Sequence, residues 1–151
     1  MARNAGLLEA PTAPAERIYT GVLYTALGLD RLSSGGRRRA GRWLVTTSSV
    51  FGLVRPSDRI LDLRSTTYQA FWRPDGELAT RTVTARVVHE RGGHRSVVSH
   101  SNKATKGRLV RSLLEASASP PTVTGMVSAL RDLGWQVDRA GSRLDVVVDE
   151  V

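Results

Sequence analysis

The two lysines of this chain, Lys103 and Lys106, lie at the start of a predicted helix, in a stretch that also holds Asn102, Arg108 and Arg111. The remaining basic residues, of 22 in all, are arginines. A helix N-terminus carries partial positive charge and unpaired N–H groups, so lysines there are unfavourable unless an anion lies opposite. The stretch therefore predicts a site for anions, formed by these five side chains.

The predicted helix runs from Asn102 to about Ala116 and has one apolar side. On a helical wheel, both lysines fall on that side, while the outer face carries Arg108, Arg111 and Glu115. The apolar arc itself consists of Leu109, Val110, Leu113 and Leu114. Two interpretations follow: a basic cleft between this helix and a sheet, or snorkelling lysines whose stems cover apolar surface.

The ends and spacing of this helix make two further predictions. Asn102 or Ser101 is a suitable N-cap, since both side chains can accept a bond from a free backbone N–H. Gly107 lowers helix propensity and allows a second backbone or a phosphate to come close.

The net charge of +8 predicts an acidic partner, and nucleic acid is the first candidate. The preference for arginine over lysine is also what a GC-rich genome produces. The total charge alone therefore does not distinguish a protein that binds nucleic acid from one that does not. The cluster of Arg37, Arg38, Arg39 and Arg42 is interpreted as a solvated face of a short helix.

Length and composition predict one small domain inside the cell. The 151 residues and 40% hydrophobic content suffice for a single core. The absence of cysteine excludes disulfides and thiolate chemistry. The first residues lack the apolar region of a signal peptide and no segment is long enough to span a membrane, so we expect a cytoplasmic protein without a membrane partner. The sequence does not fix the oligomeric state.

The pattern of elements predicts an α+β fold with small mixed sheets, two β-hairpins and four to five helices. Residues 1–13 are predicted to be a disordered tail and residues 14–151 a single domain. In its first half we expect helices over Pro14–Leu27, Arg37–Arg42 and Ser65–Phe71, and strands over Trp43–Thr47 and Ile60–Leu63, with a turn marked by Gly52 and Pro56.

The second half has clearer signals. One hairpin is predicted from Thr80–His89 into Ser96–Ser99 through Arg91-Gly92-Gly93-His94, and another from Trp135–Arg139 into Arg143–Val148. Between them, the lysine-bearing helix is followed by a second helix from Thr122 or Thr124 to Leu133.

Other side chains are weaker site candidates. Tyr19 and Tyr24 on one helix, together with Asp58, could line a site, although core packing and a salt bridge are the plainer interpretations. Arg55, on a turn before Pro56, is equally consistent with a phosphate contact and with a structural bond. We assign no catalytic residue, no cofactor and no metal, because His89, His94 and His100 lack carboxylates at ligand spacing.

Four blocks of the chain, in order, resemble the bacterial YaaA peroxide-stress family. They are Glu16 to Tyr24, Ser48 to Asp58, Leu61 to Tyr68 and Ser99 to Arg111. The resemblance implies cytoplasmic proteins that protect DNA under oxidative stress by limiting intracellular iron. It also implies binding of duplex and branched DNA through a positive cleft with a helix-hairpin-helix element.

The chain also departs from that family. An N-terminal hydrophobic strand and an internal segment with a Tyr-Arg-Leu-x-Met core are missing, and Arg59-Ile60 runs straight into Leu61. Three functions stay open: a non-enzymatic protein that binds the DNA phosphate backbone without reading sequence, an enzyme or binding protein for a small phosphorylated or carboxylated ligand, and a truncated, non-functional paralogue. We expect the first. In the second, the lysines would hold the anion and Tyr19 or Asp58 would act as acid–base group.

Overall fold

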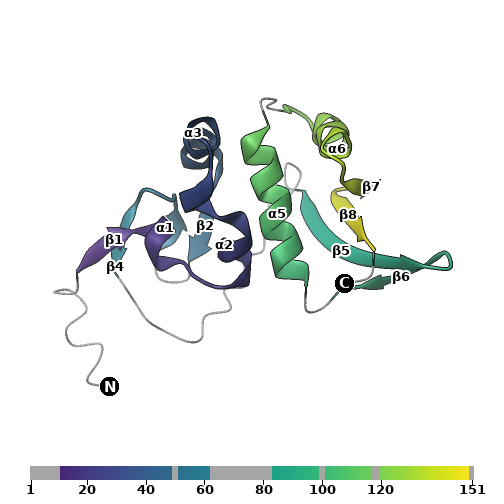
Figure 1. Ribbon diagram of the computed structural model, residues 1–151, viewed down its shortest axis with the longest axis horizontal. Helices are drawn as coiled ribbons and strands as arrows, with labels where there is room; N and C mark the ends of the chain where they lie inside the picture. The colour runs from purple at the N-terminus through teal and green to yellow at the C-terminus, as the bar shows by residue number, and fades with distance from the viewer. Residues whose placement is uncertain (1–10, 49–50, 62–82, 99–100, 117–119, 150–151) are drawn as a thin grey trace, which may run out of the picture.

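One helix, α5 (Asn102–Glu115), lies between the two halves of the chain (Figure 1). The computed structural model describes residues 11–48, 51–61, 83–98, 101–116 and 120–149. The amino-terminal half contains β1 (Thr12–Pro14), α1 (Ala15–Ile18), α2 (Val22–Leu27), the 3₁₀ helix η3 (Leu29–Arg31), α3 (Ser34–Trp43), β2 (Thr46–Ser48), β3 (Gly52–Val54) and β4 (Arg59–Leu61). The carboxy-terminal half adds β5 (Thr84–Arg91), β6 (His94–Val97), α6 (Val123–Asp132), β7 (Gln136–Ala140) and β8 (Arg143–Val148). The predicted α+β class is confirmed.

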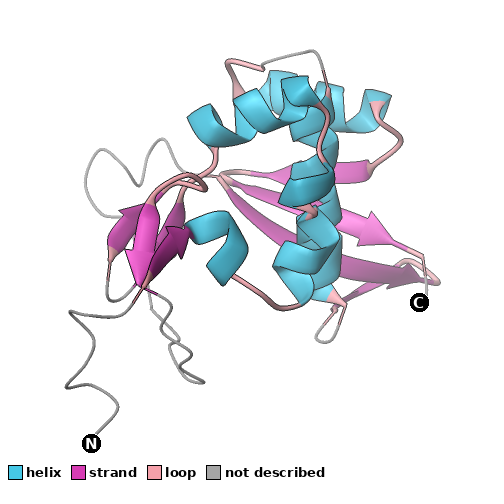
Figure 2. Ribbon diagram, turned by 60° about the vertical axis from the view of Figure 1, so that its left-hand side comes forward, coloured by secondary structure: helices cyan, strands magenta, loops and turns pink. Residues whose placement is uncertain are grey.

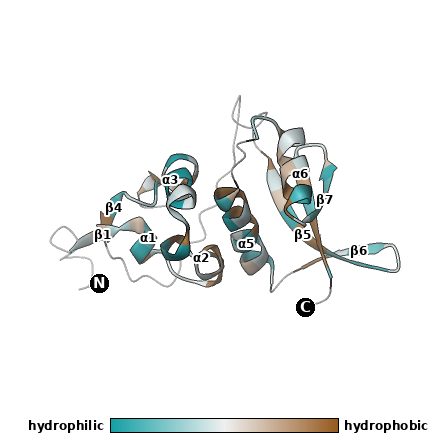
Figure 3. Ribbon diagram, turned by 45° about the horizontal axis from the view of Figure 1, so that its top comes forward, coloured by the Kyte–Doolittle hydropathy of each residue, from teal (hydrophilic) through white to brown (hydrophobic). Residues whose placement is uncertain are grey.

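The carboxy-terminal half is a four-stranded sheet in the order β6-β5-β8-β7. Both predicted hairpins are present, β5 with β6 and β7 with β8, and the two hairpins join through a parallel pairing of β5 with β8. Gly92, Gly93 and Gly141 have φ of 57°, 76° and 63°, so the glycines supply the left-handed backbone that both turns need. The four residues of the edge strand β6 are all exposed, and most of the strand is hydrophilic (Figure 3).

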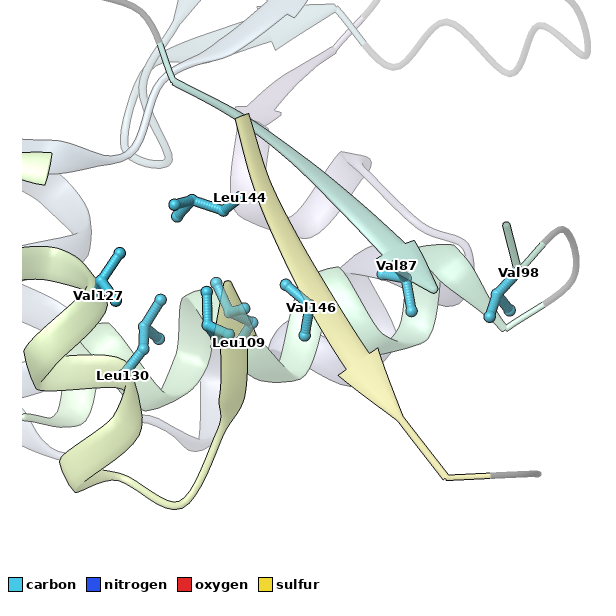
Figure 4. Close-up of a cluster of buried hydrophobic side chains, with 8 residues drawn as sticks. Val87, Val98, Leu109, Val127, Leu130, Leu144 and Val146 are labelled. Atoms are coloured by element: carbon cyan, nitrogen blue, oxygen red, sulfur yellow. The ribbon is translucent and has the colours of Figure 1, made fainter. Parts of the chain in front are cut away.

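The main core forms where α5 and α6 cover one face of this sheet (Figure 2). Alternate residues of the strands point to the helices, as the period of two along a strand requires. Figure 4 shows this cluster, which consists of Val87, Val98, Leu109, Val127, Leu130, Val137, Leu144 and Val146.

Helix α5 is buried on two sides. Leu109 packs into the sheet core, whereas Leu114, with Val110 beside it, packs into a second core under α2, η3 and α3. Gly107 lies against α2: a Cβ there would overlap the carbonyl oxygen of Leu23 and lie 3.0 Å from the Leu27 nitrogen. The predicted close approach at Gly107 is therefore to a backbone, and it fixes how the two halves pack.

The amino-terminal half is built from short elements. β1 pairs with β4 and β2 with β3, both antiparallel. The backbone N–H groups of Ala15 and Glu16 at the start of α1 donate to the carbonyls of Asp58 and Pro56, at 2.8 and 3.0 Å. The turn before β4 therefore satisfies donors that a helix start leaves free.

The prediction of one helix over Pro14–Leu27 was wrong. The chain leaves helical geometry at Tyr19 and re-enters at Gly21, whose φ is +108°, so α1 and α2 are separate. A bulky residue would be strained at this φ, and glycine allows the break. The predicted end at Gly28 is confirmed, with φ of 57°.

The other predictions for this half differ in their outcomes. The predicted strand Trp43–Thr47 starts later, at Thr46, because α3 continues to Trp43. Strand β3 replaces part of the predicted turn at Gly52, and the strand predicted over Ile60–Leu63 is β4, from Arg59 to Leu61. The helix predicted over Ser65–Phe71 lies outside the described residues. Of the predicted tail, Thr12 and Ala13 pair with β4.

The sheet face away from the helices carries a buried carboxylate. Asp145 on β8 is 5% exposed and accepts bonds from Arg86 at 3.0 and 2.8 Å and from Arg143 at 2.9 Å. These bonds, those of Arg86 first, hold the pKa of the Asp145 carboxyl below its ordinary value. A carboxyl with a lowered pKa stabilises the fold above its ordinary pKa, and this contribution is lost as pH falls through the lowered one.

We expect Asp145→Asn to lower the free energy of unfolding by about 2 kcal/mol at neutral pH, because two arginines lose a charged acceptor. The difference from the wild type should shrink as pH falls below about 4 and on through the lowered pKa of the wild-type carboxyl. Denaturant unfolding between acid and neutral pH measures both effects. A difference that stays constant over this range would contradict the assigned role of Asp145.

Candidate anion-binding site at the start of α5

The first turn of α5 is not closed by a side chain. Ser101 occupies the N-cap position with φ −85° and ψ −3°, and its side chain accepts no capping bond. Asn102 does not cap either, since its Oδ1 atom is buried and has no hydrogen-bond partner in the described part of the chain. The predicted cap by Ser101 or Asn102 was therefore wrong, and the N–H groups of the first turn have no capping side chain.

The two lysines of this turn have different surroundings. Lys103 is exposed, whereas Lys106 is partly buried. Burial lowers the pKa of the Lys106 amine below its ordinary value. Within the described ranges, neither amine has a carboxylate within the 4.0 Å of an ion pair. The prediction that both lysines lie equally on the inward side is corrected: only Lys106 does.

Arg108 adds a third positive charge next to the lysines. It is exposed, and its Nη2 donates to Thr105 Oγ1 at 3.3 Å. Thr105 is itself buried and donates to the carbonyl of Ser101 at 3.1 Å. This chain of bonds holds the Arg108 side chain toward the start of the helix.

Arg111 was predicted on the outer face of α5, and this prediction was wrong. Its guanidinium donates to the carbonyls of Leu27, Gly28 and Arg31 at 3.0, 2.8 and 2.8 Å. These carbonyls belong to the end of α2 and to η3, and that of Gly28 also accepts the Arg31 backbone N–H, at 3.0 Å. Arg111 therefore joins the two halves of the protein.

Glu115, also predicted to face outward, holds the other end of α5 against α3. Its carboxylate accepts bonds from the Ser33 backbone N–H, at 2.9 Å, and from the Ser33 hydroxyl. The Ser33 bonds are the main reason that the pKa of Glu115 is lowered. In return, Arg39 donates to the carbonyls of Leu114 and Glu115. Glu115 of α5 thus accepts hydrogen bonds at the start of α3, and Arg39 of α3 donates hydrogen bonds to carbonyls at the end of α5.

The arginines of α3 are accordingly not one solvated face. Arg39 is bound to α5, and Arg37 donates to the Asp30 carbonyl at 3.0 Å and lies 3.5 Å from Glu16. Arg38 and Arg42 are exposed, as predicted for the whole cluster.

Arg55 and Asp58 form a structural turn. The Arg55 guanidinium donates to the carbonyls of Gly41 and Arg42, at 3.1 and 3.4 Å, near the end of α3. The Asp58 carboxylate accepts the Arg55 backbone N–H at 2.8 Å. Among the described residues, the Asp58 carboxylate pairs with this backbone N–H, and the expected salt bridge of Asp58 is not found there.

Tyr19 and Tyr24 stack on each other, with ring centroids 5.3 Å apart and planes at 13°. The Tyr19 hydroxyl is buried without a partner among the described residues. Tyr24 bonds to Thr46, and burial raises the pKa of its phenol. Tyr19 also packs against the small core of Ala15, Val54 and Ile60, so the pair is part of the packing in this half.

The histidines are spread along the β5–β6 hairpin. Nδ1 of His89 lies 3.2 Å from the Val148 carbonyl oxygen, His94 is exposed near the tip, and His100 lies outside the described residues. In the described ranges, no three side chains of the ligating types come together as a metal site. No helix in those ranges is long and apolar enough to cross a bilayer.

A groove of about 350 Å³ lies toward the other end of α5. Its lining is apolar and comes from the end of α3, the second half of α5 and the start of α6: Trp43, Leu44, Val110, Leu113, Leu114, Pro120 and Met126. No lysine or arginine lines it, so this groove is distinct from the candidate anion site. Sequence reasoning missed it, because Trp43 was placed in a strand.

Because Arg111 binds three carbonyls, we expect Arg111→Met to lower the free energy of unfolding by about 2 kcal/mol. Arg108→Met removes a charge of the same type three residues earlier without exposing a carbonyl, so it should change stability by less than about 0.5 kcal/mol. Urea unfolding of both variants measures the difference. Equal effects would show that Arg111 is not a structural anchor.

Comparison of the sequence with known proteins shows the family of this chain. The sequence model described as "Peroxide stress protein YaaA" matches residues 58–140. A UPF0246 protein of Streptomyces coelicolor is 42% identical over an alignment that covers 100% of this chain and 75% of that protein. UPF0246 proteins of Corynebacterium efficiens and Corynebacterium glutamicum are 31% and 30% identical, each over 89% of this chain and 68% of the relative.

These alignments also bear on the internal segment that the sequence analysis found missing. The alignment with the Streptomyces protein has 196 positions against 151 residues here, so 45 positions of that relative have no counterpart within the aligned region. The predicted resemblance is confirmed: the chain belongs to the peroxide stress protein YaaA family.

Proposed function

We propose that this protein is a non-enzymatic, cytoplasmic, DNA-associated protein of the peroxide-stress response that binds the phosphate backbone at the start of α5. Lys103, Lys106 and Arg108 supply the positive charge, and the uncapped N–H groups of the first turn add donors. The link to limiting intracellular iron is part of this proposal and is drawn from the family resemblance.

The observation that carries the proposal is the contrast between the two lysines of this site and the arginines that bind within the fold. Arg39, Arg55 and Arg111 bind backbone carbonyls, and Arg86 binds a buried carboxylate. The lysines have no such partner in the described ranges, and they lie where a helix already favours an anion. A phosphate group is the natural ligand for such a cluster.

The chemistry of the site favours binding without sequence preference. Lysine acts as a point charge toward phosphate and carries no base-reading geometry by itself. The exposed Arg38 and Arg42 lie toward the far end of α5, and a helix of 14 residues is about 21 Å long. They therefore belong to a separate surface and serve as a control.

Salt dependence tests the proposal. With about three phosphates engaged, the logarithm of the association constant for duplex DNA should fall with the logarithm of salt concentration at a slope of roughly −3. Fluorescence anisotropy with labelled duplexes of unrelated sequence measures this slope and the sequence preference. Binding that ignores salt, or that distinguishes sequences strongly, would contradict it.

The partial burial of Lys106 favours a second candidate, a protein for a small anionic ligand. Such a ligand would be phosphorylated or carboxylated and would use the same lysines. The same titration separates the two, because a small phosphate ester that competes at micromolar concentration would favour the second candidate.

A further inference from the structure

The four-stranded sheet ends in two edge strands, β6 and β7, and β7 is blocked by a side chain. An edge strand offers free N–H and C=O groups to which a strand of another molecule can bind. On β7, the carbonyl of Val137 already accepts bonds from the Arg131 guanidinium of α6, from Nε at 3.0 Å and from Nη2 at 2.6 Å. A second molecule could therefore pair along β7 only by displacing Arg131.

The other edge strand, β6, is open. Its residues are all exposed, and the β5–β6 hairpin extends away from the amino-terminal half of the chain (Figure 1). Val98, directly after β6, donates its backbone N–H to the Val87 carbonyl at 3.0 Å. In an antiparallel pair, residues that bond to the neighbouring strand alternate with residues whose N–H and C=O point away. Ser96 therefore bonds toward β5, and the backbone groups of Arg95 and Val97 point outward.

The charged side chain of β6 does not block this edge. Arg95 lies opposite Glu90 in the hairpin register and donates to its carboxylate at 2.6 Å. Its Nη2 atom donates at 2.5 Å to Asp138, which lies on β7 at the other edge of the sheet. The guanidinium therefore lies over its own sheet with its charge paired, whereas a charge that protects an edge projects past it. The neighbouring Val97 is apolar and 57% exposed.

We propose that β6 pairs with β6 of a second copy of this chain, antiparallel across a two-fold axis, and forms a dimer with one continuous sheet. With Ser96 opposite the partner's Ser96, Arg95 of each chain pairs with Val97 of the other, and the outward backbone groups of both strands are all used. A shift that puts Arg95 opposite the partner's Arg95 brings like charges together. A shift that puts Val97 opposite the partner's Val97 leaves Arg95 without a partner inside β6. This inference goes beyond the proposed function and does not depend on DNA binding.

The dimer should be weak, because β6 is short. About four new backbone hydrogen bonds form, and the stem of the partner's Arg95 covers the Val97 side chain. We expect a dissociation constant on the order of 100 μM, since this contact is much smaller than a standard interface. Sedimentation equilibrium of the full chain should show monomer well below this concentration and dimer well above it. Monomer at every concentration would overturn the proposal and leave the edge to a strand of a different protein.

Disulfide formation tests the register of the two strands. The chain has no cysteine, so Ser96→Cys introduces a single thiol. Across the proposed axis, the two Cα atoms at position 96 would lie about 4.5 Å apart, within reach of a disulfide. His94→Cys is the matched control, because it is exposed on the same strand but its two Cα atoms would lie about 14 Å apart. Under mild oxidation at equal protein concentration, Ser96→Cys should link at least about tenfold faster. Equal rates would overturn the proposed pairing.

A charge placed on the edge tests the interface itself. Val97→Lys puts a lysine opposite the partner's Arg95, so the dissociation constant of the dimer should rise about tenfold. Gln136→Lys adds the same charge at an exposed position of β7 and should change it by less than about twofold. Circular dichroism checks that both variants keep the fold. Equal weakening by the two variants would assign the effect to net charge, and no weakening by Val97→Lys would place the interface elsewhere; either result would overturn the proposal.

Discussion

Replacing Lys103 and Lys106 together with methionine is expected to weaken duplex DNA binding on the order of 50-fold at 0.1 M salt, because two of three phosphate contacts are lost. The slope of binding against salt should change from roughly −3 to about −1. The fold should be retained or slightly stabilised, since methionine keeps the stem at position 106 and removes the charge of a partly buried side chain. Anisotropy titrations over a range of salt concentrations measure both numbers.

Arg38→Gln with Arg42→Gln is the matched control for the lysine pair. It also removes two positive charges, but from exposed positions on α3, so the net charge changes equally. Binding should fall by no more than about threefold, through the general field of the protein. If the control weakens binding as much as the lysine pair does, total charge rather than the α5 site determines binding.

Gly107→Ala is expected to have the largest effect on stability, with a loss of about 3 kcal/mol in the free energy of unfolding. The added Cβ would overlap the Leu23 carbonyl oxygen and lie 3.0 Å from the Ala26 Cβ and from the Leu27 nitrogen. Backbone atoms of α2 cannot move aside as a flexible side chain could, so α2 and α5 must separate. Denaturant unfolding followed by circular dichroism gives the value.

Gly41→Ala provides the comparison for this substitution. Gly41 also lies in a helix, α3, and a Cβ there meets nothing within 4 Å. Alanine should raise the free energy of unfolding by up to about 1 kcal/mol, because it has the higher helix propensity. If Gly107→Ala is equally harmless, the two halves do not pack through this contact.

Local signals predicted the second half of the chain well. The glycines at 92, 93 and 141 marked turns, and the alternation of side chains on either side of them gave both hairpins. Helices α5 and α6 were predicted within one or two residues, and Thr122 caps α6 through Gly125 N at 3.1 Å. The parallel pairing of β5 with β8 had no local signal, because it depends on contacts far apart in sequence.

The first half was predicted less well because its geometry depends on tertiary contacts. The break between α1 and α2 occurs at Gly21, a residue that a helical pattern tolerates. Ser33 caps α3 by accepting from the Gly36 N–H at 3.0 Å, and its bonds to Glu115 come from a residue 82 positions away. No spacing in the sequence connects those two residues.

The candidate site could also be predicted only in part, because some of its basic side chains bind residues far away in the sequence. The types and spacing of Lys103, Lys106 and Arg108 were sufficient to select them as candidate anion ligands. The sequence could not separate them from Arg55 and Arg111, since a guanidinium bound to carbonyls and one free for phosphate look alike on a helical wheel. The structure assigns these two to carbonyls of α3 and of the α2–η3 region.

Amide chemical-shift mapping by NMR during titration with a short duplex tests the central claim most directly, because it locates binding residue by residue. The account predicts that the largest changes fall on the backbone N–H groups from Asn102 to Arg108, and that they weaken as salt is raised. Changes concentrated on α3 around Arg38 and Arg42, or on the β5–β6 hairpin, with none at the start of α5, would contradict it.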